Sequence, residues 1–146
     1  MSISIKKNLT PTKNDIEQIA TLLRGYNFQL IGSYRTQDLL ISLHDGDIFI
    51  GGGYALIKLG WLHINLLWIE PKFRKMGNGA LLLSKLENIA VNKFNIKNFK
   101  LNTGSFQKSR EFYEHFGYTV FAELEIYPEN RDKEKKYIDF YMKKII

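Results

Sequence analysis

The sequence predicts an α+β fold with a mixed, mostly antiparallel central sheet and flanking helices. Residues 38–70 are rich in β-branched and aromatic side chains, and the turn sequences HDGD and KLGW interrupt them. This pattern predicts three consecutive antiparallel strands. Residues 76–94 then carry apolar side chains at helical spacing and precede a short strand, which predicts a βαβ unit. With 146 residues, the chain is expected to form a single domain over 1–146.

The first element expected is a helix within residues 11–28, because its apolar residues recur at helical spacing. Asn14 or Asp15 is its expected N-cap, and Gly25 is expected to lie past its end. The remaining elements are expected in the order strand 38–44, strand 47–58, strand 61–70, helix 76–94, strand 98–103, helix 105–117, strand 118–127 and strand 137–145. The three glycines at 51–53 indicate a bulge or a close approach of two backbones rather than a phosphate-binding loop.

Composition excludes several classes of protein. The chain has no cysteine, which excludes disulfides, thiolate nucleophiles and cysteine zinc sites, and which fits a cytoplasmic location. The N-terminal stretch lacks the apolar segment of a signal peptide, and no apolar run reaches the roughly 18 residues of a membrane span. We therefore expect a cytoplasmic protein without a membrane partner. The His, Asp and Glu residues have no metal-ligand spacing, so no metal site is expected.

The net charge of +6 fits an anionic partner of some kind. A nucleic-acid-binding module is one reading of this charge. That reading predicts aromatic and basic residues interleaved in a run such as those of RNA-binding sheets, and the chain has no such run. The lysines are scattered, which is typical of a solvated surface. Nucleic acid is therefore the less favoured partner.

The stretch EPKFRKMGNGALLLSKLENIA, residues 70–90, places a basic turn with two glycines directly before a helix. It is not a dinucleotide-binding fingerprint, because Leu82 stands where a third small residue is needed, and it is not a P-loop. Glycines let successive N–H groups converge on an anion, and the helix dipole points at the same place. The turn is therefore predicted to bind a pyrophosphate with Arg74, Lys75, Met76, Gly77, Asn78, Gly79 and Ala80.

Two stretches carry a family resemblance. LLWIEPKFRKMGNGALLLSKLENIA resembles the acetyl-CoA-binding motif of the GNAT superfamily of N-acetyltransferases, in the form of its small bacterial members. About 40 residues later, SREFYEHFGYTVF is similar to that family's second recurring element. The residues that match this second element are Ser109, Phe112, Tyr113, Gly117 and Tyr118. The resemblance covers about residues 38–146.

The resemblance implies that acetyl-CoA (coenzyme A) is the co-substrate and lies between two parallel strands that splay apart, here 61–70 and 98–103. Splayed strands leave backbone groups unpaired, and the amides of the pantetheine arm supply partners for them. The positions that match are Leu67, Trp68 and Ile69, with Ser109 and Tyr113 from the second element. The family often has an asparagine where this chain has Phe106, and Gln107 is the candidate substitute.

The resemblance also implies direct attack of an amine on the thioester of acetyl-CoA in a ternary complex. Tyr113 matches the residue that protonates the leaving thiolate, and a phenol with a pKa near 10 is protonated at neutral pH. An N–H group near Ile69 is the expected oxyanion donor. His63 is the candidate base, because strand alternation would place residues 61, 63, 65, 67 and 69 on one face. Glu123 and Glu125 are alternative acceptor-facing groups.

The sequence therefore predicts an acyl-CoA-dependent N-acetyltransferase, a transferase of acetyl groups. A catalytically idle acyl-CoA-binding regulatory module is the main alternative, since binding and catalysis share most residues. A nucleic-acid-binding domain is the less favoured one. The acceptor stays open between a small-molecule amine, an antibiotic and a protein amine, and the acyl group stays open between acetyl and longer chains. A homodimer also stays open.

Overall fold

The computed structural model describes residues 1–146, which separate into two compact units, Met1–Arg35 and Thr36–Ile146. The first unit contains one helix, α1 (Lys13–Ile31). The second contains a six-stranded sheet and the remaining helices. The expectation of a single domain over 1–146 stays a prediction.

Helix α1 begins two or three residues earlier than the predicted caps indicated. Thr12 is its N-cap: the Thr12 hydroxyl accepts from the Asp15 N–H (3.1 Å), and the Thr12 N–H donates to the Asp15 carboxylate (2.8 Å). The predicted cap at Asn14 or Asp15 is therefore wrong, because Asp15 is the third helical residue of a capping box. Gly25 does not end the helix either. The helix continues to Ile31, and Gly32 is its C-cap with a positive φ of 81°.

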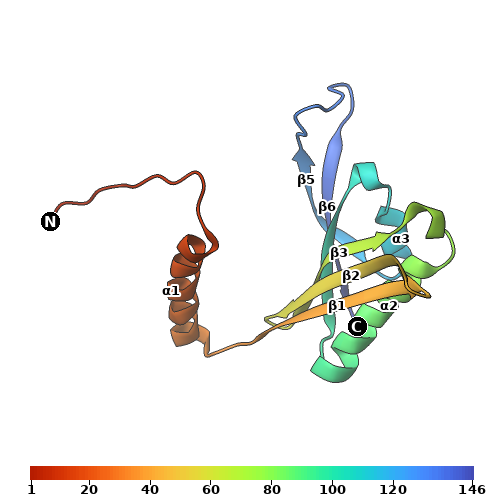
Figure 1. The fold of residues 1–146 in the computed structure, drawn as a ribbon, viewed down its shortest axis with the longest axis horizontal. Coiled ribbons are helices and arrows are strands. Elements are labelled where there is room, and N and C mark those ends of the chain that lie inside the picture. The colour runs from red at the N-terminus through yellow and green to blue at the C-terminus, as the bar shows by residue number, and fades with distance from the viewer. The chain divides into compact units, whose positions relative to one another are not determined.

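The second unit is built on a sheet with the order β1-β2-β3-β4-β6-β5 (Figure 1). Only β3 and β4 pair in parallel, and all other neighbours are antiparallel. This arrangement confirms the predicted mixed, mostly antiparallel sheet. The strands are β1 (Thr36–Asp45), β2 (Ile48–Lys58), β3 (Trp61–Ile69), β4 (Asn98–Gly104), β5 (Thr119–Ile126) and β6 (Tyr137–Ile145).

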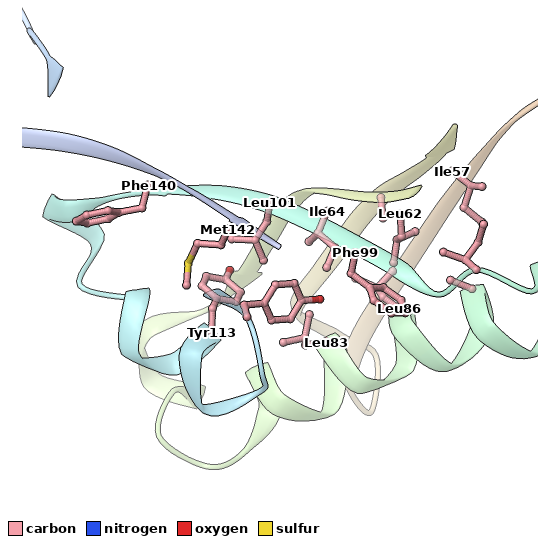
Figure 2. Close-up of a cluster of buried hydrophobic side chains, with 14 residues drawn as sticks. Ile57, Leu62, Ile64, Leu83, Leu86, Phe99, Leu101, Tyr113, Phe140 and Met142 are labelled. Carbon is pink, nitrogen blue, oxygen red and sulfur yellow. The ribbon is translucent and has the colours of Figure 1, made fainter. Parts of the chain in front are cut away.

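Helices α2 (Asn78–Phe94) and α3 (Arg110–His115) pack on one face of this sheet, which we call the helix face (Figure 2). Leu83 and Leu86 of α2 point towards the strands, and Tyr113 of α3 lies beside Met142. Two short 3₁₀ turns, η1 (Pro71–Phe73) and η2 (Ser105–Gln107), follow β3 and β4. The buried strand residues of the helix face are Ala55, Ile57, Leu62, Ile64, Phe99, Leu101, Phe140 and Met142.

The glycines of β2 allow its neighbours to approach closely, as the sequence predicted. A Cβ atom on Gly51 would collide with the Trp68 carbonyl oxygen, and one on Gly52 would lie 2.8 Å from the Ile41 carbonyl oxygen. One on Gly53 would lie 2.9 Å from the Leu86 Cδ1. The three glycines pair with the last residues of β3, and there is no room for a side chain at any of them.

A bulge in β3 overturns the predicted alternation along that strand. Tyr54 of β2 pairs with Leu66, but Ala55 pairs with Ile64, so Asn65 is an extra residue in β3. An extra residue reverses the facing of every side chain beyond it. The prediction that residues 61, 63, 65, 67 and 69 share one face is therefore wrong. Leu67 and Ile69 lie on the helix face, whereas His63 lies on the opposite face.

The parallel pairing of β3 with β4 is short. It joins Trp61–Ile64 to Asn98–Leu101 and does not continue beyond Leu101. Beyond this point β4 pairs only with β6. The two strands therefore splay, as the resemblance implied.

A buried ion pair fastens α2 to β6. The Glu87 carboxylate accepts from the Lys144 ammonium (2.8 Å) and from the Tyr118 hydroxyl (2.5 Å), and both charged side chains are mostly buried. Burial and the bond to Glu87 raise the pKa of Tyr118, so its hydroxyl remains a donor. The three groups satisfy one another inside the core.

We expect Glu87→Ala to lower the free energy of unfolding by about 3 kcal/mol, because it leaves the Lys144 ammonium buried without a partner. Denaturant titration measures the change. The matched control is Glu114→Ala, which breaks the half-exposed Arg110–Glu114 pair and should cost less than about 1 kcal/mol. Equal losses for the two variants would contradict a structural role for the Glu87 cluster.

Candidate functional site

The turn between β3 and α2 is fixed by side chains that bond to its own backbone. The Arg74 Nε donates to the Ile69 carbonyl oxygen (2.7 Å), and the Arg74 guanidinium lies 4.5 Å from the centre of the Trp68 ring. The Asn78 amide donates to the Phe73 carbonyl oxygen (2.9 Å). Arg74 therefore brings a positive charge to the end of β3 in a defined orientation.

The same turn presents unpaired N–H groups. Lys75 and Gly77 both take left-handed backbone conformations, at φ 61° and φ 83°, and alternation of this kind turns successive N–H groups towards one concave side. The first N–H groups of any helix lack intrahelical partners. Gly77 is the N-cap of α2 and has no side chain to accept from them. The turn is therefore suited to an anion, because the helix dipole adds to these donors.

A cavity of about 1010 Å³ opens from this turn along the helix face. It is mostly apolar and runs past the ends of the splayed strands to α3, so it suits a long ligand with one anionic end. Its lining residues are Leu67, Trp68, Ile69, Arg74, Lys75, Gly77, Gly79, Ala80, Phe106, Gln107, Lys108, Ser109, Phe112, Tyr113, His115 and Phe116.

Most of the predicted binding residues therefore lie at one cavity. Met76 and Asn78 are exceptions: Met76 is exposed, and Asn78 bonds within the turn. The sequence analysis did not single out Lys108, His115 and Phe116, which also line the cavity, and it named Phe112 only as a residue of the second family element. Lys108 lies between β4 and α3 in a segment without a motif of its own, but its position after the second splayed strand could have indicated its place.

Residues 106 and 107 take different roles at this cavity. Phe106 is exposed and lines it with an apolar ring. The Gln107 amide oxygen accepts from the Thr103 hydroxyl (2.8 Å) and the Gly104 N–H (3.0 Å), which closes the turn after β4. Only the Gln107 NH₂ group remains to donate to a ligand, so Gln107 offers less than the asparagine it was expected to replace.

Tyr113 lies at the inner wall of the cavity. Its side chain is 9% exposed, and its ring packs against the rings of Phe112 and Tyr118. Burial raises the pKa of Tyr113 above 10, so the phenol is protonated at neutral pH. Its hydroxyl makes no hydrogen bond within the chain, which leaves it free to donate to a ligand.

The end of β3 also has a backbone N–H group, that of Ile69, which faces the place where β3 and β4 separate. The Glu70 N–H donates to Ile50 of β2 (2.8 Å). Successive N–H groups of a strand point to alternate sides, so the Ile69 N–H points away from β2, towards the side where β4 has departed. A donor therefore faces the cavity at the place where the strands separate.

A second cavity, of about 170 Å³, lies on the opposite face of the sheet at the same splay. Its lining residues are His63, Ile64, Asn65, Lys100, Leu101, Asn102, Phe121 and Tyr141. Partial burial, with the charges of Lys100 and Lys58, lowers the pKa of His63 below 6.5. His63 is therefore neutral at pH 7, and the sheet separates it from Tyr113.

The other titratable candidates lie elsewhere. Glu123 and Glu125 pair with Phe140 and Ile138, which places them on the helix face rather than beside His63. His44 hydrogen-bonds Ser42 on β1 (3.0 Å). No group of three or more His, Asp and Glu residues lies close enough to hold a metal ion, and no helix is long and apolar enough to cross a membrane.

Comparisons with known proteins agree with this arrangement. The sequence profile of the acetyltransferase (GNAT) domain matches residues 23–130. The chain is 32% identical over 78 residues to the blasticidin-S acetyltransferase of Streptomyces morookaense. That match covers 53% of this chain and 57% of the relative, so the chain spans little more than half the length of this curated relative.

Solved structures show the same fold. An acetyltransferase from Bacillus cereus superimposes with a TM-score of 0.79 at 23% identity, covering 97% of this chain and 98% of the other. The PaiA N-acetyltransferase of Thermoplasma acidophilum, solved in complex with coenzyme A, gives a TM-score of 0.60 at 19% identity. That comparison covers 94% of this chain and 81% of the other. At these identities the likeness concerns the fold.

Proposed function

Because this chain belongs to the GNAT family of acetyltransferases, we propose that it moves an acetyl group from acetyl-CoA to a primary amine in a ternary complex. One observation carries the proposal: a single cavity connects the turn at Arg74–Gly79 to the splayed end of β3 and to Tyr113. An acyl-CoA has its pyrophosphate, its amide-bearing arm and its thioester in the same order.

The residues at the cavity fit this co-substrate. The N–H groups after Gly77 and the charges of Arg74 and Lys75 would bind the pyrophosphate. The unpaired backbone of Leu67–Ile69 would bind the two amides of the arm as a neighbouring strand would. Ser109 and Ala80 would line its path. Acetyl-CoA supplies an acetyl group activated as a thioester.

The chain's own groups complete the reaction. A C–N bond forms and the C–S bond breaks, so the amine loses one proton and the sulfur gains one. The Tyr113 hydroxyl donates the proton that the sulfur gains, and the Ile69 N–H stabilises the negative charge that develops on the carbonyl oxygen. Both donors face the same cavity, which supports their acting together.

The proton of the amine leaves on the other side of the sheet. An acceptor that approaches the splay from the opposite face passes the smaller cavity, where His63 is neutral and able to accept a proton through a water molecule. The bulge at Asn65 excludes direct alignment of His63 with Ile69, so the path through water is the one that fits. The thiolate would thus gain its proton on the helix face, and the amine would lose its proton on the opposite face.

The first test is acetyl-CoA binding. We expect saturating acetyl-CoA to raise the free energy of unfolding by about 2.7 kcal/mol at one hundred times Kd. Gly79→Glu should abolish this gain and the heat of binding in calorimetry, since it puts a negative charge at the pyrophosphate site. Gly25→Glu, in an open position on α1, is the charge control. Absence of any binding to the unaltered protein would overturn the proposed function.

The second test concerns Tyr113. We expect Tyr113→Phe to lower kcat by about 10²-fold or more, because the leaving sulfur loses its proton donor, while Kd for acetyl-CoA changes little. Steady-state thiol release and calorimetry measure the two quantities, with Tyr127→Phe, at an exposed position, as the control. An unchanged kcat would mean that Tyr113 only packs in the core and donates no proton. Binding without thiol release for any amine would favour an idle acyl-CoA-binding module.

The third test concerns His63 and pH. Protonated His63 cannot accept a proton, so kcat should fall as the pH drops through the lowered pKa of His63, below 6.5. We expect His63→Ala to slow turnover and to remove this acid limb, whereas His44→Ala should retain it. The measurement is kcat between pH 5 and 9 at saturating acceptor. The same limb in His63→Ala would mean that the proton leaves by another route.

A further inference from the structure

The smaller cavity carries positive charge at one end. Lys100 lines it, and Lys143 of β6 pairs with Lys100 in the sheet register, so both ammonium groups lie on the opposite face. Lys100 lies 5.9 Å from the centre of the Trp61 ring, and Lys143 lies 5.6 Å from that of Phe121. Neither lysine takes part in any ion pair of the chain. The two rings belong to β3 and β5, on either side of the β4–β6 pair, so an anion bound between them would be attracted by both charges.

A carboxylate contacts a lining residue of this cavity at the other end. The Asn102 amide donates to the Asp139 carboxylate (3.1 Å). Asn102 lies two positions beyond Lys100 on β4, which is roughly 7 Å along the strand. The other acid on this face, Asp38, is three strands from Lys100 and accepts from the Tyr54 hydroxyl. The Asn102 end is also where β3 and β4 separate.

Aromatic rings line the same cavity. Phe121 and Tyr141 line the cavity, and Tyr141 pairs with Asn102 across β4 and β6. A cavity of about 170 Å³ takes a small or planar body, and rings favour an apolar one. The cavity is therefore lined by an amide that holds the Asp139 carboxylate, by two aromatic rings, and by Lys100, and Lys143 lies over one of those rings.

We propose that the acceptor amine carries an anionic group of its own, which Lys100 and Lys143 bind while the amine lies near Asn102 and Asp139. This inference rests on the proposed function and names its substrate class: a compact amine whose amino and anionic groups are separated by several bonds. The amino group reaches the place where β3 and β4 separate and forms the amide there, while the C–S bond of the thioester breaks and the sulfur gains a proton. The anion takes no part in bond making and serves to orient the acceptor.

A matched pair of acceptors tests this class. 4-(Aminomethyl)benzoate carries an amine and a carboxylate across a ring, and 4-methylbenzylamine has a methyl group in place of the carboxylate. We expect kcat/KM for the carboxylate to exceed that for the neutral partner by about tenfold or more, as expected for a charge-assisted hydrogen bond. The phosphonate analogue of the same amine distinguishes a carboxylate site from a phosphate site. A preference for 4-methylbenzylamine over both anions would overturn the proposal.

Substitution of the lysines tests where the anion binds. Lys100→Gln and Lys143→Gln should each lower the ratio of the two kcat/KM values by about tenfold, because each removes one of the two cations. Lys93→Gln, in the last turn of α2, removes the same charge at an exposed site and should leave the ratio unchanged. Salt near 1 M should also reduce the ratio. A ratio that survives both lysine substitutions contradicts the proposed site.

A binding measurement separates this proposal from the proposed function. 4-Methylbenzoate has no amine and cannot be acetylated, so its binding is independent of catalysis. We expect it to shift the His63 ring signals in NMR spectra of the protein saturated with coenzyme A, and Lys100→Gln to abolish the shift. No shift in the unaltered protein would overturn the anion site even if amines are acetylated. Failure to bind acetyl-CoA would instead count against the proposed function.

Discussion

Backbone pairing between β3 and β4 stops after Ile64 and Leu101, and both cavities of the sheet lie at that place. The extra residue Asn65 turns β3, and the side-chain-free Gly51–Gly53 segment of β2 lets the turned strand stay paired on its other side. β4 follows β6 instead. Without the bulge, a continuous ladder would satisfy the backbone of Leu67–Ile69 and leave no unpaired groups for a ligand.

The splay gives the two faces of one sheet different chemistry. The helix face offers a long apolar cavity with donors at both ends: the turn after β3, and the Ile69 N–H with the buried Tyr113 hydroxyl. The opposite face offers a small, polar cavity beside a neutral His63. Burial moves the pKa of Tyr113 upwards and that of His63 downwards, so the Tyr113 phenol stays protonated and the His63 imidazole stays unprotonated at neutral pH.

The sequence predicted the elements well because each has a strong local signal. Turn sequences bound the three antiparallel strands, and helical spacing marks α2, so their bounds agree with the structure within a few residues. The family resemblance is confirmed as well. The facing of His63 was predicted wrongly because a bulge has no side-chain signature of its own in the largely apolar run WLHINLLWI; only the register with β2 reveals it. The pairing of Lys100 with Lys143 was not predicted for a similar reason, since β4 and β6 are distant in sequence.

The Glu87 cluster has a consequence for how tightly a ligand can bind at the far end of the same helix. Glu87 ties the middle of α2 to Lys144 and Tyr118, while Arg74 and Asn78 hold the turn before it. The donors after Gly77 are therefore preorganised: their positions are set by folding, and an incoming phosphate orders little backbone on arrival. The affinity of this turn for a phosphate would in this way depend partly on the core, so a substitution at Glu87 would lower that affinity without contacting the ligand.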